Sequence, residues 1–156
     1  MSADTNKPNN KPNNEAGFAG GAEALVFGFL LLFVVTLIIA NGWAVIHTKF
    51  ALSSGSREAT RVYVEEVLGG SDDARATSLA QSVGQDAIEG YGSSYPNEVV
   101  VDAGGDRCTV VTAEATSDVP FFILPGISTR ASIRVSARHS ERVDPFRSGI
   151  EGEVSC

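Results

Sequence analysis

The stretch ALVFGFLLLFVVTLIIANGWAVI, from Ala24 to Ile46, determines how this chain is organised. Its 23 residues include no ionisable side chain. At about 1.5 Å per helical residue they reach about 34 Å, more than the roughly 30 Å hydrocarbon core of a bilayer. The stretch therefore predicts a membrane-spanning helix, with Trp43 at the headgroup level.

Two other interpretations of this stretch remain open. It could be a buried helix of a globular domain, although so long an uncharged run is rare in soluble cores. It could also be a cleaved secretory signal, because Ala40, Gly42 and Ala44 are small residues at a suitable separation. Against a signal, the apolar region is too long, and Lys7 and Lys11 are not adjacent to it.

The remaining residues divide into segments around this stretch. Residues 1–16 repeat Asn-Lys-Pro-Asn-Asn and predict a disordered tail. Helical periodicity continues beyond the span to a stop at Gly69-Gly70, so one helix is expected over 17–68, with an apolar stripe of Leu52, Ala59, Val62, Tyr63 and Val67. We expect a soluble α+β domain over 71–147 and a flexible C-terminal tail over 148–156.

A second helix is expected directly after the two glycines. Ser71 is predicted as its N-cap, with Asp72 and Asp73 in the first turn and an end near Gly90. Its expected apolar face consists of Ala76, Leu79, Ala80, Val83 and Ala87.

The hydrophobic period then changes from helical to two, which predicts a small antiparallel sheet. EVVVDAGGDRCTVVTAEAT is expected to form two strands joined by a turn at 104–106, and Ile133, Val135 and Ala137 should face inward on a third strand. Between the last two strands, Phe121 to Leu124 form a hydrophobic loop. It is either cover for one sheet face or an exposed contact, and we favour packing, because so small a sheet needs apolar cover.

The charge of the chain argues against several classes of partner. Its formal net charge is −7, and from His47 onward there are ten Lys and Arg against sixteen Asp and Glu. An acidic surface without a basic stripe argues against nucleic-acid binding. It also gives no reason to expect attraction to anionic lipid headgroups.

The sequence supports no catalytic or metal site. His47 and His139 are far apart, and His139, Ser140 and Glu141 are consecutive on an expected strand, where neighbours point to opposite faces. The histidines and cysteines lack zinc spacing, and the glycine-rich stretches lack the residues of a phosphate-binding loop. We therefore expect no enzyme activity and no cofactor.

The orientation in the membrane is argued from two opposing signals. The basic residues after the span, Lys49, Arg57 and Arg61, outnumber the two lysines before it and mildly favour a cytoplasmic C-terminus. We expect the opposite, because the N-terminal tail is short and because Cys108 and Cys156 could pair in an oxidising compartment. Two free thiols remain the alternative for these cysteines.

The start of the apolar stretch carries a carboxylate and a set of small residues. Glu23 is either an interfacial residue or a group that pairs with a partner in the membrane. Small side chains recur four residues apart at two sets of positions, which could let another helix approach closely: Gly17 and Gly21, and Gly20, Ala24 and Gly28.

These features together resemble a known family. The Gly-rich start before Glu23, the single apolar span and the segment NGWAVIHTKFALSSGSREATRVYVEE resemble the TadE-like proteins, minor pilins or pseudopilins of the tight-adherence (Tad) pilus assembly system, especially those of actinobacteria. The ending VSARHSERVDPFRSG is similar as well. The resemblance covers Gly17 to about Glu66 well and the rest loosely.

The resemblance implies a pilin-like fold and a role for Glu23. In pilin-like proteins a peptidase cuts after a glycine, and a glutamate at the fifth mature position pairs with the new N-terminal amine of a neighbouring subunit. Here a cut between Gly17 and Phe18 makes Glu23 the sixth residue, and cuts after Gly20 or Gly21 make it the third or second. The chain could instead be an uncut membrane-anchored assembly factor.

Two functions follow as hypotheses. The first is a single-pass structural component of a Tad-type pilus or its secretion machine, at the cell membrane or in a surface pilus with its C-terminal domain extracytoplasmic. Its expected partners are other pilin or TadE/TadF-like subunits, the Tad inner-membrane machinery and membrane lipid. The second is a membrane-tethered extracytoplasmic binding module whose span serves only as an anchor.

Overall fold

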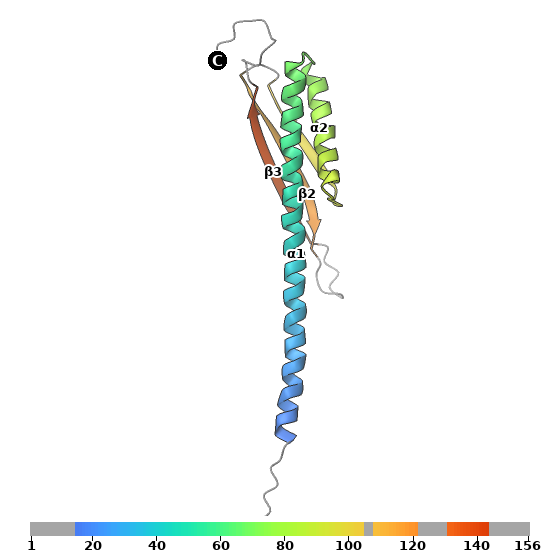
Figure 1. Cartoon of the computed structure of the whole chain (residues 1–156), viewed down its shortest axis with the longest axis vertical. Coiled ribbons are helices and arrows are strands. Elements are labelled where there is room, and N and C mark those ends of the chain that lie inside the picture. The colour runs from blue at the N-terminus through green and yellow to red at the C-terminus, as the bar shows by residue number, and fades with distance from the viewer. Residues whose placement is uncertain (1–14, 105–107, 122–130, 144–156) are drawn as a thin grey trace, which may run out of the picture. The chain divides into compact units, whose positions relative to one another are not determined.

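The computed structural model describes residues 15–104, 108–121 and 131–143. These ranges contain α1 (Glu15–Leu68), α2 (Asp73–Gly90), β1 (Asn97–Asp102), β2 (Val110–Pro120) and β3 (Ser132–Arg142), as Figure 1 shows. The predicted α+β class is confirmed at this level, with a long apolar N-terminal helix, a second helix and a small antiparallel sheet. Residues 1–14 of the predicted N-terminal tail, the whole predicted C-terminal tail and residues 105–106 of the predicted turn lie outside the described residues.

The chain forms two compact units, residues 1–39 and 40–156. The described part of the first unit is helical throughout, from Glu15 to Ile39. The second unit contains the rest of α1, then α2 and the sheet. The boundary between the units falls inside the apolar stretch, seven residues before its end at Ile46.

The end of α1 is a Schellman motif built on Gly70. Its φ of +88° is a left-handed conformation that favours glycine. The Ser71 N–H donates to the Glu66 carbonyl at 3.0 Å, and the Gly70 N–H donates to the Val67 carbonyl at 3.1 Å. The Ser71 hydroxyl also donates to Glu66 Oε2 at 2.6 Å, so Ser71 completes α1 and does not begin α2.

The N-cap of α2 is Asp72, and the prediction of Ser71 is wrong. The Asp72 backbone is extended, and its Oδ1 accepts a hydrogen bond of 2.8 Å from the Arg75 N–H. A carboxylate in this position satisfies one of the free N–H groups at the helix start. The buried Tyr63 of α1 donates its hydroxyl proton to Asp73 Oδ1, which ties the first turn of α2 to α1.

The two helices lie side by side, and two glycines allow their close contact (Figure 1). A Cβ added to Gly55 would lie 2.4 Å from Ile88 Cγ1 and 2.7 Å from the Gly84 carbonyl oxygen. A Cβ added to Gly84 would lie 3.0 Å from the Ala59 Cβ. Larger residues at Gly55 or Gly84 would therefore force the helices apart.

The buried face of α2 differs in part from the predicted one. It consists of Ala76, Ala80, Gly84 and Ile88, four residues apart. Ala76 and Ala80 were predicted, but Leu79 is exposed and Val83 and Ala87 are half-buried. The close approach at Gly84 explains the difference, because α2 packs through its smallest side chains and turns the larger Leu79 outward.

The predicted stripe on α1 is buried at Leu52, Ala59 and Tyr63 and half-buried at Val62 and Val67. The sequence argument missed the small polar residues that share this face. These buried residues are Asn41, Thr48, Ser56 and Thr60. The Thr60 hydroxyl donates to the Arg57 carbonyl at 2.9 Å, so its burial leaves no unsatisfied donor.

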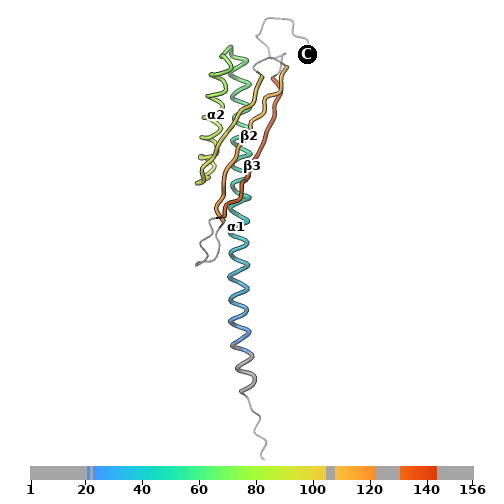
Figure 2. The backbone as a smooth tube through the Cα atoms, turned by 180° about the vertical axis from the view of Figure 1, so that it is seen from behind, coloured from blue at the N-terminus to red at the C-terminus, as the bar shows by residue number. Residues whose placement is uncertain are grey.

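The sheet has the order β1-β2-β3 with antiparallel pairs throughout. One face packs on both helices, as Figure 2 shows from behind, and the other face is open. The inward residues of β2 alternate strictly and are all small or β-branched: Val111, Ala113, Ala115, Ser117 and Val119. On β3, Val135 and Ala137 are buried as predicted, whereas Ile133, near the end of the sheet, is 41% exposed.

The hydrophobic loop between β2 and β3 is described only at its start. Val119 and Pro120 belong to β2, and Phe121 is 40% exposed, with its N–H donating to the Ala131 carbonyl at 2.8 Å. Residues 122–124 lie outside the described residues, so the predicted packing of this loop stays a prediction.

A substitution at Gly55 tests the contact between the helices. We expect Gly55→Ala to lower the free energy of unfolding of the full chain in detergent micelles by about 1–3 kcal/mol, because the new methyl overlaps Ile88 and backbone of Gly84. Gly42→Ala is the matched control on the same helix, since a Cβ there meets nothing within 4 Å. It should leave stability unchanged or raise it by up to about 1 kcal/mol. Equal effects of the two substitutions would contradict the close contact.

Candidate functional site

The apolar half of α1 is the most unusual surface of the described structure. Between Leu25 and Ile39, twelve large apolar side chains are 40–76% exposed. Soluble monomers rarely expose so large a contiguous apolar surface, and a helix that is apolar on all sides is normally enclosed by a protein core or by a membrane.

Among the described residues, one helix, within Glu23–Leu68, is long and apolar enough to cross a membrane. The hydroxyl group in its apolar part is satisfied internally, because Thr36 Oγ1 donates to the Leu32 carbonyl at 2.8 Å. Such local pairing is what a hydroxyl needs where water is absent.

The uncovered part of this helix is shorter than the apolar stretch itself. Asn41 and Thr48 are buried within the second unit, and Ala44 and Val45 pack against its core. The residues from Ala24 to Ile39 reach about 24 Å as a helix, which is less than the roughly 30 Å of a hydrocarbon core. The predicted length of about 34 Å counted residues that the structure assigns to the folded unit.

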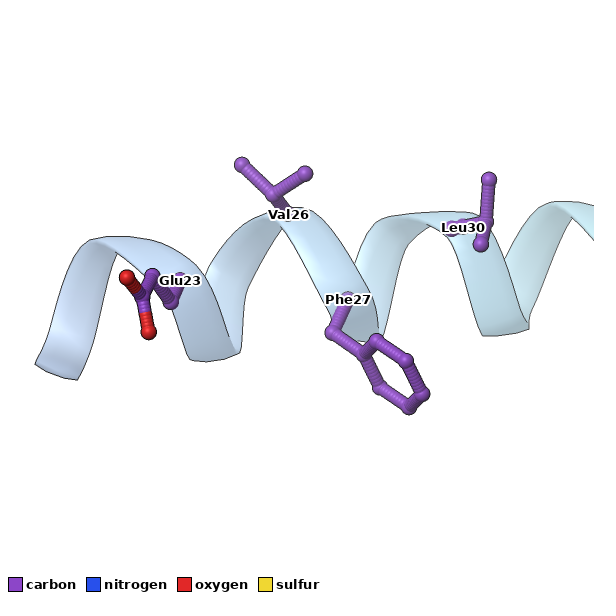
Figure 3. A pocket seen from close by; sticks show the side chains of 4 residues that line it. All are labelled: Glu23, Val26, Phe27 and Leu30. Atoms are coloured by element: carbon purple, nitrogen blue, oxygen red, sulfur yellow. The ribbon is translucent and has the colours of Figure 1, made fainter.

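Glu23 lies on the surface of this apolar helix. It lines a recess of about 460 Å³ together with Val26, Phe27 and Leu30, which Figure 3 shows on successive turns. Glu23 and Phe27 are one turn apart, as are Val26 and Leu30. A single carboxylate thus lies among apolar side chains on an open surface of the helix.

The small residues near Glu23 whose surroundings are described are not required by contacts with the rest of the described chain. A Cβ added to Gly21 or to Gly28 meets nothing within 4 Å, in contrast to Gly55 and Gly84. Ala24 is exposed. Gly17, Phe18 and Gly20 lie within α1, and their surroundings are not described. Gly21, Ala24 and Gly28 therefore form an exposed strip with little side-chain volume along the helix.

The residues considered for catalysis lie apart within the second unit. His47, on α1, contacts Tyr91 with ring centroids 5.5 Å apart. His139 is on β3 opposite Ala113, in the same strand as Ser140 and Glu141. Within the described ranges, no three His, Cys, Asp or Glu side chains are grouped so as to hold a metal ion.

Cys108 takes part in a disulfide bond. It lies in the turn before β2 with a φ of +69°, and its N–H donates to the Val143 carbonyl at 3.1 Å. The chain's other cysteine, Cys156, lies outside the described residues, so the predicted pairing of Cys108 with Cys156 stays a prediction.

A second, polar recess lies on the open face of the sheet. Its volume is about 220 Å³, and its lining includes Glu98, Thr116, Asp118 and Arg134. Arg134 Nε lies 3.2 Å from Asp118 Oδ1, and this hydrogen bond raises the pKa of the guanidinium above its ordinary value. A parallel pair joins Arg138 and Glu114 at 2.8 Å. Both pairs are solvent-exposed and contribute little to stability.

Comparison with protein-family models, with curated proteins and with solved structures finds no match to this chain.

Sequence reasoning named Glu23 and the small residues, but it did not separate the part of α1 that belongs to the second unit, from Ala40 onward, from the part before it. The start of the folded unit on α1 coincides with the first of its buried polar residues, Asn41. Thr48, Ser56 and Thr60 lie at four-residue spacings from Leu52 and therefore on the same face of α1. This repeat of small residues could have shown that this face of α1 is packed.

Arginine substitutions test whether the apolar half of α1 is held in lipid. The unaltered chain should stay in the membrane fraction after alkaline carbonate extraction. The double variant Leu30→Arg/Phe33→Arg should be released, since each central charge costs about 2.5–3.5 kcal/mol in a bilayer. Phe50→Arg is the control, because Phe50 and Leu30 are equally exposed at 59% but Phe50 belongs to the second unit. Release of the unaltered chain would contradict a membrane span.

Proposed function

We propose that this protein is a single-pass membrane component of a Tad-type pilus or of its secretion machine, and that it assembles with other pilin-like subunits through the apolar half of α1. The observation that carries the proposal is an uncovered apolar helix with one carboxylate and a low surface of small residues beside it. The role is structural, with no catalysis and no cofactor. The resemblance of Gly17 to Glu66 to TadE-like proteins supports the same function.

The position of Glu23 along the helix supports a role inside the bilayer. If the folded unit begins at Ala40, the 17 residues from Glu23 to Ile39 cover only about 26 Å. A hydrocarbon core of roughly 30 Å then extends back to about Gly20, which places Glu23 about one turn inside it. Glu23 is then not an interfacial residue.

A carboxylate at this depth needs a partner. An ionised side chain in hydrocarbon costs several kcal/mol unless a cation or hydrogen-bond donors compensate it. Apart from Glu23, the described residues from Gly21 to Ile39 include no charged side chain. We therefore expect the partner to be an amine from another subunit, which would also fix the relative height of the two helices.

Processing of the N-terminus would supply such an amine. A cut between Gly17 and Phe18, or after Gly20 or Gly21, creates a new α-amino group within six residues of Glu23. That amine on one subunit would lie at about the same depth as Glu23 on its neighbour. The uncovered surface at Gly21, Ala24 and Gly28 would allow the two helices to come close enough to pair.

The second unit is proposed to lie outside the cytoplasm. The disulfide bond at Cys108 supports this orientation, because such bonds persist in oxidising compartments. It outweighs the small excess of basic residues after the span, which is a preference and not a rule.

Substitutions at Glu23 and Gly28 test the assembly role. We expect Glu23→Gln to reduce recovery of the chain with its partner subunits, cross-linked in the source cell's membrane, by at least about tenfold, because the amine is left without a counter-charge. Gly28→Leu should act similarly by holding the helices apart. Gly42→Leu is the control, since Gly42 is equally open but lies in the second unit. Unchanged recovery of Glu23→Gln would refute the pairing mechanism.

The alternative is a membrane-tethered binding module, and the polar recess on the sheet is the observation that favours it. Glu98, Asp118 and Arg134 would there contact a polar ligand or cell-wall component. Under this function, Glu23→Gln leaves activity in the source cell intact, whereas Arg134→Ala abolishes it. The opposite pattern is expected of an assembly subunit.

A further inference from the structure

Exposed aromatic side chains of the second unit lie toward one end. Trp43, Tyr91 and Phe121 are 68%, 48% and 40% exposed, and they come from α1, the C-cap of α2 and the residue after β2. Phe50, at 59%, follows two turns after Trp43 on α1. We call this surface, with the exposed Ile46 and Ile133, the aromatic end. Figures 1 and 2 agree that the end of α2, the end of β2 and the start of β3 lie beside the same part of α1.

Contacts within the second unit fix this arrangement. His47 lies one turn after Trp43 on α1, and its ring contacts Tyr91, so Tyr91 lies beside this part of α1. Ile133 pairs with Val119 in the sheet, next to the pair of Pro120 and Ser132 that precedes Phe121. Lys49 donates to the Ser136 carbonyl, which holds the start of β3 beside this stretch of α1.

The opposite end of the unit has a different chemistry. It contains the turn between α1 and α2, with Asp72 and Asp73, and the pair of Val110 and Arg142 at the other end of β2 and β3. The described aromatic residue nearest this turn, Tyr63, is fully buried and hydrogen-bonded to Asp73. Among the described residues of the second unit, the exposed aromatic side chains therefore lie away from this end.

We propose that the aromatic end docks the second unit onto the lipid surface, with Trp43, Tyr91 and Phe121 in the headgroup layer. This inference rests on the membrane span of the proposed function. It goes beyond that function because it assigns a lipid contact to residues of α2 and the sheet, which an anchored domain does not need.

The position of this surface along the chain favours lipid as its occupant. The aromatic end lies where α1 enters the second unit, directly after Ile39, the last residue of the uncovered apolar helix. Any bilayer that encloses Leu25 to Ile39 therefore places Trp43 within about 6 Å of the hydrocarbon boundary. Tryptophan and tyrosine favour this layer because they combine an apolar ring with a polar group.

The charged groups near the aromatic end are compatible with this layer. Asp118 and Arg134 neutralise each other at 3.2 Å, and the Lys49 ammonium is hydrogen-bonded to the protein. The chain is acidic overall, so the attraction comes from aromatic and apolar side chains and not from anionic headgroups. Vesicles of the zwitterionic lipid phosphatidylcholine are accordingly a suitable probe of this surface.

Tryptophan fluorescence provides the test, because Trp43 is the only tryptophan in the chain. The full-length protein is inserted into phosphatidylcholine vesicles whose acyl chains carry bromine near the carbonyl end. In a Trp43→Phe background, single tryptophans replace Tyr91, Phe121 or, at the opposite end, Val110, which is 52% exposed. Bromine quenches a tryptophan only when the two are in close contact.

We expect the unaltered chain to be strongly quenched, and the Tyr91→Trp and Phe121→Trp chains to be quenched at least about half as much. Val110→Trp should not be quenched. Because Tyr91 and Phe121 are exposed and lie on different elements, a variant that fails to fold leaves the other to decide the test.

Each other outcome has a defined meaning. If Trp43 is quenched but the tryptophans at 91 and 121 behave like that at 110, the docking inference is wrong and the membrane span stands. Equal quenching at 110, 91 and 121 likewise overturns it, because no end of the unit is then distinguished. If Trp43 itself escapes quenching, the membrane span of the proposed function is wrong as well.

Discussion

The structure depends on one constraint: a single helix must satisfy two environments along its length. From Ala40 onward α1 is packed, and its small residues let α2 and the sheet approach closely. Before Ala40 it is apolar and uncovered. Because a helix satisfies its own backbone, the same element can continue from protein core to lipid without exposing unpaired N–H or C=O groups. The residue at which one environment gives way to the other therefore sets the depth of every group along α1.

The depth of Glu23 follows from this constraint. If the membrane span is taken to be the whole apolar stretch, Glu23 lies at the edge of the membrane. If the span is taken to end where the folded unit begins, Glu23 lies about one turn inside the hydrocarbon core, where an ionised carboxylate is costly without a partner. In the proposed assembly, the same carboxylate would hold two subunits at a fixed height, because pairing with a cation relieves that cost. Among the described residues, its recess is lined by Val26, Phe27 and Leu30, and none of these side chains can pair with the carboxylate.

Patterns of residue type predicted most of the fold. The apolar stretch, the change of period after Gly90 and the alternation of β3 identified the long helix, the second helix and the sheet. The two glycines, Gly69 and Gly70, correctly predicted where α1 ends. They did not show that Ser71 would cap the end of α1, so that Asp72 becomes the N-cap of α2. The failure on α2 has a physical cause. Which face of a helix is buried depends on how closely another helix approaches, and Gly55 and Gly84 decide that only once both helices are in place.

The candidate site could be predicted as a set of residues, because Glu23 and its small neighbours are close in sequence. Its depth could not, because that requires knowing where the fold begins.

Mass spectrometry of the mature N-terminus, on protein from the membrane fraction of the source cell, tests the central claim most directly. A pairing role for Glu23 predicts a chain that begins at Phe18, Gly21 or Ala22, with the whole apolar half of α1 retained. A chain that keeps its first residues would provide no new amine and would contradict the pairing. A start near Trp43 or Val45 would remove the uncovered helix, and the membrane assembly role with it.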